Sequence, residues 1–263
     1  MGHLFDKKFQ YGTINNHRSA ISAYHIPIDG VKVGSHPLVC DLLKGVNNER
    51  PPLPKYRFIW DVDLVLGKMN DLPENHDLSM DILGYKLVTL LGLCAVQRGS
   101  EIHALNIKWM SKTSEGYKCY FGSRVKHSKQ GKVAPPVEFY PFPQNPKLCP
   151  VLCLDAYIEQ TQPFRALVGN DLFLSTKSPH KPVVKCTLTK WILKMLAMAG
   201  IDTKKFQAHS LRSSSTSKVA ARGHNVKDIL SMGNWSSQSV WQKFYHKRII
   251  SSGEKFQNTL LSG

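Results

Sequence analysis

The sequence predicts a mainly α-helical domain with a small antiparallel β-sheet, an α+β fold, and three patterns support this prediction. Apolar residues recur at helical spacing along most of the chain, most densely over residues 78–96. Aromatic and β-branched residues instead fill 117–125 and 133–142, as they do in strands. The polar, glycine-containing segment KHSKQGK between these two runs suits a hairpin connection.

The remaining elements are expected in the following order. A helix over 13–24 has Thr13 as a candidate N-cap, and another covers 59–69. Asp77 is the candidate cap of the long apolar helix, which ends near Gln97. Helical spacing returns over 150–161, over 187–199 and through the C-terminal third.

A proline-rich segment divides the chain. Three prolines in PPLP exclude helix and strand interiors and favour an extended backbone. We therefore expect a short helical region at 1–50, a linker at 51–57, the main domain at 58–250 and a tail at 251–263. No internal repeat or low-complexity tract is visible.

The charge balance points to a polyanionic partner. The chain of 263 residues carries 35 Lys and Arg against 19 Asp and Glu, a formal net charge of +16. The excess lies in two blocks, residues 103–149 and 204–248, which a fold can bring together around one ligand. Solvated surface lysines remain the alternative for any single member of these blocks.

A membrane partner fits less well than nucleic acid. The most apolar stretch contains Asp81 and Lys86, which suits a core helix better than a bilayer span. The N-terminus has no signal-peptide stretch, and Asp6 stands where a myristoylation signal needs Ser or Thr. We expect a soluble intracellular protein with no membrane partner.

The cysteines indicate neither disulfides nor a metal site. The chain has six Cys residues, and without a secretory signal they are expected to be reduced thiols. Cys149 and Cys153 form C-x3-C, but no second Cys or His pair follows at zinc-finger spacing. No metal and no cofactor are therefore expected.

Four polar or aromatic positions stand out, and each one alone has an ordinary explanation. His209 and Arg212 form H-x-x-R, which also fits an exposed basic helix. Arg98 follows the apolar helix, where a cation complements the helix dipole. Tyr245 follows Trp235 near the C-terminus, where it could simply be a docking anchor.

Taken together, these positions resemble the active site of the tyrosine recombinases (phage integrases), which combines Arg, Lys, H-x-x-R, His or Trp, and Tyr. The resemblance covers about residues 56–248, and the weaker similarity of 13–24 suggests the end of the family's helical core-binding domain. The sequences of three segments (INNHRSAIS, the proline-rich linker and NWSSQSVWQKFY) are most similar to those of recombinases from eukaryotic DIRS-type or Ngaro-type retrotransposons. The matching positions are Arg98, Lys129, His209, Arg212, Trp235 and Tyr245, with Glu101 at the supporting acidic position of a box that resembles TGLR-xx-E.

The resemblance implies a catalytic domain, preceded by a short core-binding remnant, that cleaves and rejoins DNA through a 3′-phosphotyrosyl link. Tyr245 is the implied nucleophile, His209 its base or hydrogen-bonding partner, and Lys129 the proton donor to the leaving oxygen. Two guanidiniums hold the phosphate oxygens with planar paired hydrogen bonds. Lys126, in the same turn, is the alternative catalytic lysine. The candidate DNA contacts are Arg18, Lys126, Lys132, Lys218 and Lys243.

The implied partners are double-stranded DNA and further copies of the chain, because recombinases of this type usually act as tetramers. Nuclear residence follows only from the suspected eukaryotic origin. Three alternatives stay open: an inactive DNA-binding relative, a type IB topoisomerase and a basic scaffold protein. Two departures from the family pattern are the short N-terminal region and Asn234, which separates Gly233 from Trp235.

Overall fold

The computed structural model describes residues 1–126, 128, 131, 134–250, 253, 257, 260 and 261. It is mainly helical with two small β-sheets, which confirms the predicted fold class. The chain forms two compact units, Met1–Lys55 and Tyr56–Gly263. None of the helices in the described residues combines the length and the hydropathy that a bilayer crossing requires.

The first unit is a small helical group. Its helices are α1 (Gly2–Asp6), α2 (Tyr11–Tyr24) and α3 (Pro37–Glu49), with the 3-10 helix η1 (Val33–Ser35). Ile14, Leu43 and Val46 form its core. Thr13 was the wrong N-cap, because α2 begins one turn earlier, after Gln10.

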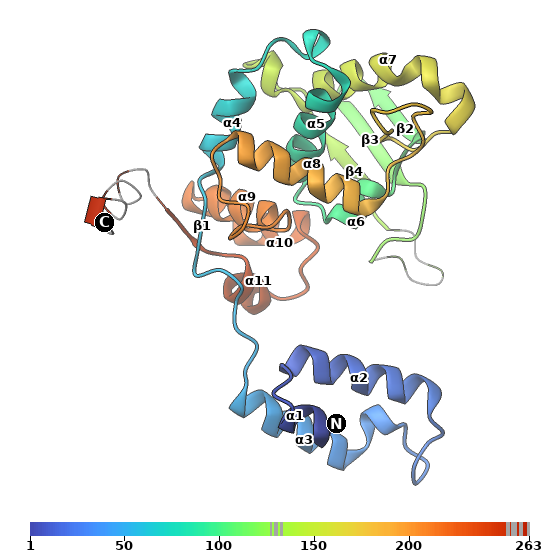
Figure 1. The fold of residues 1–263 in the computed structure, drawn as a ribbon, viewed down its shortest axis with the longest axis vertical. Coiled ribbons are helices and arrows are strands. Elements are labelled where there is room, and N and C mark those ends of the chain that lie inside the picture. The colour runs from blue at the N-terminus through green and yellow to red at the C-terminus, as the bar shows by residue number, and fades with distance from the viewer. Residues whose placement is uncertain are drawn as a thin grey trace. The chain divides into compact units, whose positions relative to one another are not determined.

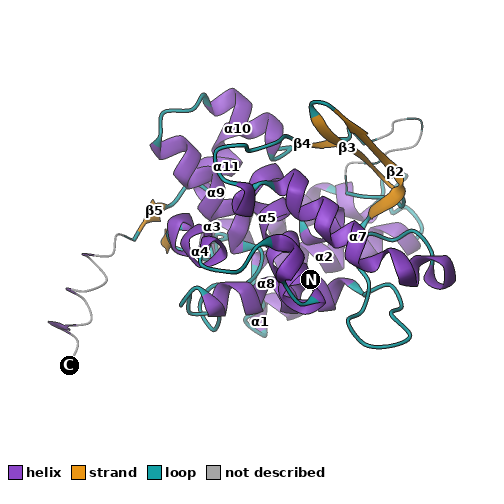
Figure 2. Ribbon diagram, turned by 90° about the horizontal axis from the view of Figure 1, so that it is seen from above, coloured by secondary structure: helices purple, strands orange, loops and turns teal. Residues whose placement is uncertain are grey.

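The second unit contains most of the helices and both sheets (Figures 1 and 2). It also holds the main hydrophobic core. Its longer helices are α4 (Val62–Asn70), α5 (Met80–Ala95), α7 (Pro150–Val168), α8 (Lys185–Met198) and α9 (Ser210–Ala221). Its short helices are η2 (Asn75–Asp77), α6 (Gly99–His103), η3 (Pro146–Leu148), α10 (Val226–Met232) and α11 (Gln238–Phe244).

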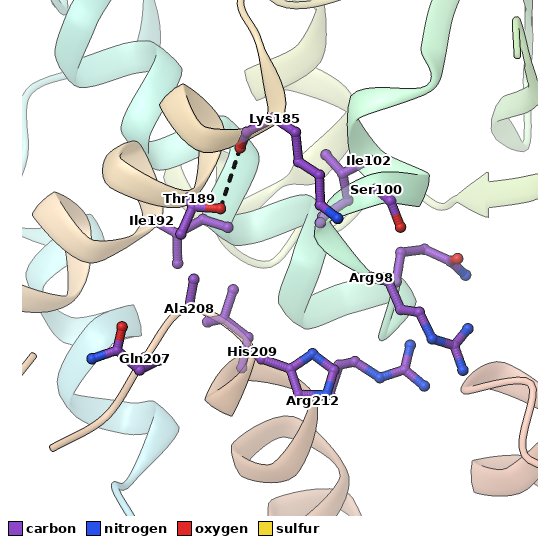
Figure 3. A pocket seen from close by; sticks show the side chains of 13 residues that line it. Arg98, Ser100, Ile102, Lys185, Thr189, Ile192, Gln207, Ala208, His209 and Arg212 are labelled. Atoms are coloured by element: carbon purple, nitrogen blue, oxygen red, sulfur yellow. Dashed lines mark hydrogen bonds between the residues drawn. The ribbon is translucent and has the colours of Figure 1, made fainter. Parts of the chain in front are cut away.

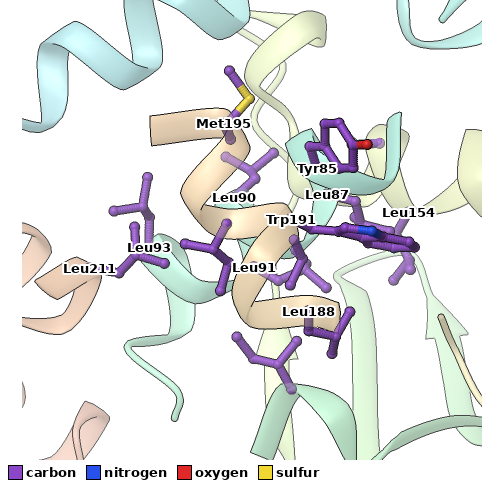
Figure 4. Packing of buried hydrophobic residues seen from close by; sticks show 14 of the residues in the cluster. Tyr85, Leu87, Leu90, Leu91, Leu93, Leu154, Leu188, Trp191, Met195 and Leu211 are labelled. Carbon is purple, nitrogen blue, oxygen red and sulfur yellow. The ribbon is translucent and has the colours of Figure 1, made fainter. Parts of the chain in front are cut away.

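Helix α5 is the centre of this unit. Almost every residue from Leu83 to Ala95 is buried, and the helix packs against α7, α8 and α9. Trp191 of α8 lies over Gly84, where a Cβ would come within 2.9 Å of the indole, so a larger residue does not fit. Figure 4 shows Leu87, Leu90 and Leu91 packed beside Trp191 and Leu188. This apolar contact fixes the positions from which α8 and α9 begin.

Three helix predictions need correction. The predicted helix 59–69 begins only at Val62, because Phe58 and Ile59 form strand β1 (Phe58–Ile59) and Asp61 caps the helix through the backbone N–H of Asp63. Ser79 takes the N-cap position of α5 in place of Asp77. Helix α5 also ends at Ala95, two residues before the predicted end.

The larger sheet has three antiparallel strands in the order β2-β3-β4: β2 (Leu105–Thr113), β3 (Gly116–Phe121) and β4 (Val137–Phe139). The sequence patterns predicted β3 and β4 in the right places, but the predicted ranges were longer than the observed strands. They did not predict β2. Its burial pattern, with exposed residues over most of its length, explains the omission. In Figure 1 the sheet lies on the side of the unit away from α9, α10 and α11.

A second, two-stranded sheet ties the two ends of this unit together. Strand β1 pairs in parallel with β5 (Arg248–Ile249), and the Ile250 N–H donates to the Ile59 carbonyl over 3.0 Å. Because β5 starts three residues after Tyr245, this pairing anchors the segment that carries the phenol.

Candidate active site

The H-x-x-R pair lies at the beginning of α9. His209 is the N-cap of this helix and Arg212 is its third residue, so both side chains leave the same helix end. The helix is secured by the Trp60 indole N–H, which donates to Ser210 Oγ over 2.8 Å in the core. His209 is exposed, whereas Arg212 is only 1% exposed.

Two backbone carbonyls hold the Arg212 guanidinium. Nη1 donates to the Val96 carbonyl, and Nη2 donates to the Gly233 carbonyl over 2.6 Å. Burial, and then the nearby Arg98 charge, lower the pKa of Arg212 to about 10, so the side chain stays cationic at neutral pH. Its Nε has no hydrogen-bond partner among the described residues. The arginine is thus oriented by rigid backbone and keeps donor capacity for an anion.

The carbonyl of Val96 is positioned by an unusual backbone conformation. Val96 ends α5 at φ 54° and ψ 28°, a left-handed conformation that β-branched residues rarely adopt. Aligned on Arg98, Val96 stands where the T-G-L-R box has its glycine, which tolerates this conformation. The turn directs the carbonyl toward Arg212, and sequence inspection alone did not identify this role.

Arg98 lies three residues beyond the end of α5 and is the N-cap of α6. Its guanidinium donates to Glu101 Oε1 over 2.8 Å, and its backbone N–H donates to Glu101 Oε2 over 2.6 Å. Oε2 also lies 4.0 Å from Arg212 Nη1. The buried Glu101 carboxylate therefore neutralises part of the charge between two guanidiniums and fixes their separation.

Arg98, Glu101, His209 and Arg212 form one cluster of side chains, and Tyr245, at the C-terminal end of α11, contacts it. Its hydroxyl lies 3.1 Å from His209 Nε2, and the Arg212 guanidinium lies 5.6 Å from its ring centroid. Its backbone is also held, because the Tyr245 N–H donates to Trp241 and Ser217 Oγ donates to the Tyr245 carbonyl over 3.1 Å. The phenol and the H-x-x-R pair, 36 residues apart at His209, converge within one chain.

Trp235 closes the cluster on one side. Its ring lies 4.7 Å from the Tyr245 ring and 4.5 Å from the Arg212 guanidinium. Asn234, the inserted residue, adopts a left-handed φ of 51°, and the indole then folds back over Gly233. A Cβ on Gly233 would lie 1.8 Å from this ring, so the glycine is required one position earlier than the family pattern predicts. The indole Nε1 is buried and has no partner among the described residues.

A pocket of about 350 Å³ opens beside the cluster (Figure 3). Arg98, His209 and Arg212 line one part of it, and Lys185 and Thr189 of α8 line another. Its 13 lining residues include no Asp or Glu. Lys185 belongs to no sequence motif, so only the fold identifies it. Within the described residues, no three His, Cys, Asp or Glu side chains gather as metal ligands.

The other predicted residues are placed as follows. Lys129 and Lys132 lie outside the described residues, and Lys126 is exposed in the β3–β4 connection. Lys218 pairs with Asp63, and Lys243 is exposed at the end of α11. Arg18, in the first unit, donates to the Gly34 carbonyl over 3.4 Å. The DNA-contact roles of all five candidates stay predictions.

Comparison with known proteins shows the fold. No protein-family model matches the chain, and no curated protein matches it in sequence. Among solved structures, the XerH site-specific recombinase bound to difH substrate has a TM-score of 0.54 at 13% identity, covering 97% of this chain and 71% of that one. XerA recombinase has a TM-score of 0.51 at 16% identity, covering 97% and 84%.

A third similar structure is the Tn1549 transposon integrase in complex with transposon right end DNA. It has a TM-score of 0.52 at 15% identity, covering 99% of this chain and 82% of that one. The chain therefore has the fold of site-specific recombinases and integrases, which is the fold that the sequence resemblance implied. At these identities the fold alone is shown, and the activity is argued from the site.

Proposed function

We propose that this protein cleaves and rejoins double-stranded DNA with Tyr245 as nucleophile, as a tyrosine recombinase. The observation that carries the proposal is the 3.1 Å contact between the Tyr245 hydroxyl and His209 Nε2, beside Arg212. A phenol next to a base and a buried cation is suited to attack on a phosphodiester. The fold and the net charge of +16 support DNA as the substrate.

The proposed cleavage step is a transesterification. The Tyr245 hydroxyl oxygen attacks phosphorus while its proton passes to His209, and the bond from phosphorus to the 5′ oxygen breaks. The phosphate becomes joined to tyrosine at the 3′ end, and a lysine protonates the departing 5′ oxygen. Attack of that hydroxyl on the phosphotyrosine reverses the step, so rejoining needs no ATP.

The two arginines stabilise the transition state. Negative charge builds on the non-bridging phosphate oxygens, and preorganised donors aimed at such charge are typically worth about 3 kcal/mol each. Arg212 is preorganised by two carbonyls and Arg98 by Glu101, so neither must reorganise during the reaction. Trp235 adds an indole N–H, which can donate but not accept a proton.

Lys129 is the proposed lysine donor, with Lys126 as the alternative. Both belong to the β3–β4 connection, and S-K-x-G around Lys129 better matches the family turn. We further propose that the protein recombines or integrates a mobile element. The resemblance of its sequence motifs to those of DIRS-type or Ngaro-type recombinases supports this, as does its structural similarity to a transposon integrase. We also propose that the protein assembles as a tetramer on DNA and that it resides in the nucleus.

The test is covalent trapping on nicked suicide duplexes, followed by denaturing gels. The parent protein is expected to form a DNA adduct that disappears in Tyr245→Phe. Tyr24→Phe is the matched control, because Tyr24 is 93% exposed in the first unit, and it should keep the adduct. Normal DNA binding with no adduct on any duplex would indicate an inactive relative. Efficient relaxation of supercoils without sequence preference would favour a topoisomerase.

A further inference from the structure

The pocket beside the cluster is also lined by Lys185, a cation that the proposed cleavage step does not use. Lys185 is exposed at the first position of α8, and its ammonium has no hydrogen-bond or ion-pair partner among the described residues. Figure 3 shows this side chain extending from α8 toward Ser100, on the same side of the pocket as Arg98. Lys185, Arg98 and Arg212 thus face one space, and no carboxylate lines it in the part of the chain that the structure describes.

The position of Lys185 is set by the core. The buried face of α8 carries Leu188, Trp191 and Ile192, which pack against the second unit's core, so the start of the helix is fixed. The Thr189 hydroxyl donates to the Lys185 carbonyl over 3.2 Å within the first turn. The flexible part is therefore the side chain alone, which suits a point charge that follows a phosphate.

We propose that Lys185 binds a DNA phosphate directly adjacent to the scissile one, with the intervening sugar in this pocket. The inference rests on the proposed function, because Arg98, His209 and Arg212 define where the scissile phosphate lies. A volume of about 350 Å³ is at the small end for ligand pockets, which suits one sugar-phosphate rather than a larger ligand. Lys185 is thus a positioning residue that sets the register of the strand.

The first measurement is DNA binding by full-length protein carrying Tyr245→Phe, so that no cleavage interferes. Adding Lys185→Ala should weaken binding to a mixed-sequence duplex about tenfold and reduce the slope of log K against log salt by about 1. Lys190→Ala is the matched control, since Lys190 is exposed on the same helix but does not line the pocket. Equal slopes for the two variants would overturn the proposal.

The second measurement locates the phosphate. Duplexes with a single neutral methylphosphonate at each position next to the cleavage site are compared in the Tyr245→Phe background. At one of the two neighbouring positions, the neutral group should weaken DNA binding by the Tyr245→Phe protein. At that position it should not change DNA binding by the protein that also carries Lys185→Ala. Losses that add independently at both positions contradict the assignment. The salt measurement does not depend on cleavage, so it tests the role of Lys185 by itself. Absence of any DNA adduct with the wild-type protein would contradict the proposed function separately.

Discussion

Replacing Arg212 by alanine tests the arginine's structural role separately from the catalytic role that we propose for it. The side chain is 1% exposed and donates to the carbonyls of Val96 and Gly233. Alanine leaves both carbonyls buried without a donor, at a cost of about 1–3 kcal/mol each, so the free energy of unfolding should fall by about 2–6 kcal/mol. Urea unfolding followed by tryptophan fluorescence measures this loss.

The same substitution should reduce cleavage far more than DNA affinity. Loss of one preorganised donor typically raises the barrier by about 3 kcal/mol, so cleavage of a suicide duplex should slow at least about a hundredfold. Affinity should fall less than about tenfold, because other cations still contact the DNA backbone. Single-turnover cleavage and fluorescence anisotropy are measured at a temperature where the variant remains folded.

Arg212→Lys provides the companion variant. Lysine keeps the charge, but its single nitrogen cannot reproduce the planar pair of hydrogen bonds to two carbonyls. Its unfolding free energy should lie between those of the parent and the alanine variant, and its cleavage should remain severely impaired. Equal fractional losses of cleavage and affinity in either variant would refute the role assigned to Arg212.

Two further substitutions test other parts of the structure. Gly233→Ala places a Cβ 1.8 Å from the Trp235 ring, so the indole must shift from its present contact with Tyr245, and adduct formation should slow by about tenfold or more. Gly67→Ala, which meets open space in α4, should form adduct at the parent rate. Lys86 is fully buried and donates to Asn75 over 2.8 Å, and burial lowers its pKa, so the unfolded chain binds its proton more tightly. Stability should therefore rise with pH toward 10.5 in the parent, and a similar rise in Lys86→Met, measured by urea unfolding at each pH, would contradict this.

The sequence could predict the parts of the fold that carry dense local patterns. Helix α5 is apolar on all sides, and the strands β3 and β4 are rich in aromatic and β-branched residues, so each was located. Strand β2 was missed because five of its nine residues are exposed, with little apolar alternation to mark it, and its pairing with β3 decides its conformation. Helix boundaries also depended on tertiary contacts, such as the pairing of Phe58 and Ile59 with β5.

The residue types of the candidate site could be predicted from the sequence, but the backbone groups and neighbouring side chains around them could not. The H-x-x-R pair, Arg98, Trp235 and Tyr245 could be recognised from order and spacing. The carbonyl of Val96 could not, because a left-handed conformation at a valine contradicts local preference and exists only where the surrounding packing enforces it. Lys185 could not either, since it reaches the site across the fold from α8.

The most direct test of the central claim is to find which atom of the protein becomes joined to DNA. Wild-type protein is trapped on a suicide duplex, digested with protease and nuclease, and analysed by mass spectrometry. The account predicts a nucleotide attached through its 3′ phosphate to the phenolic oxygen of Tyr245, with a free 5′ hydroxyl on the released strand. A nucleotide on any other side chain, or one linked through a 5′ phosphate, contradicts it.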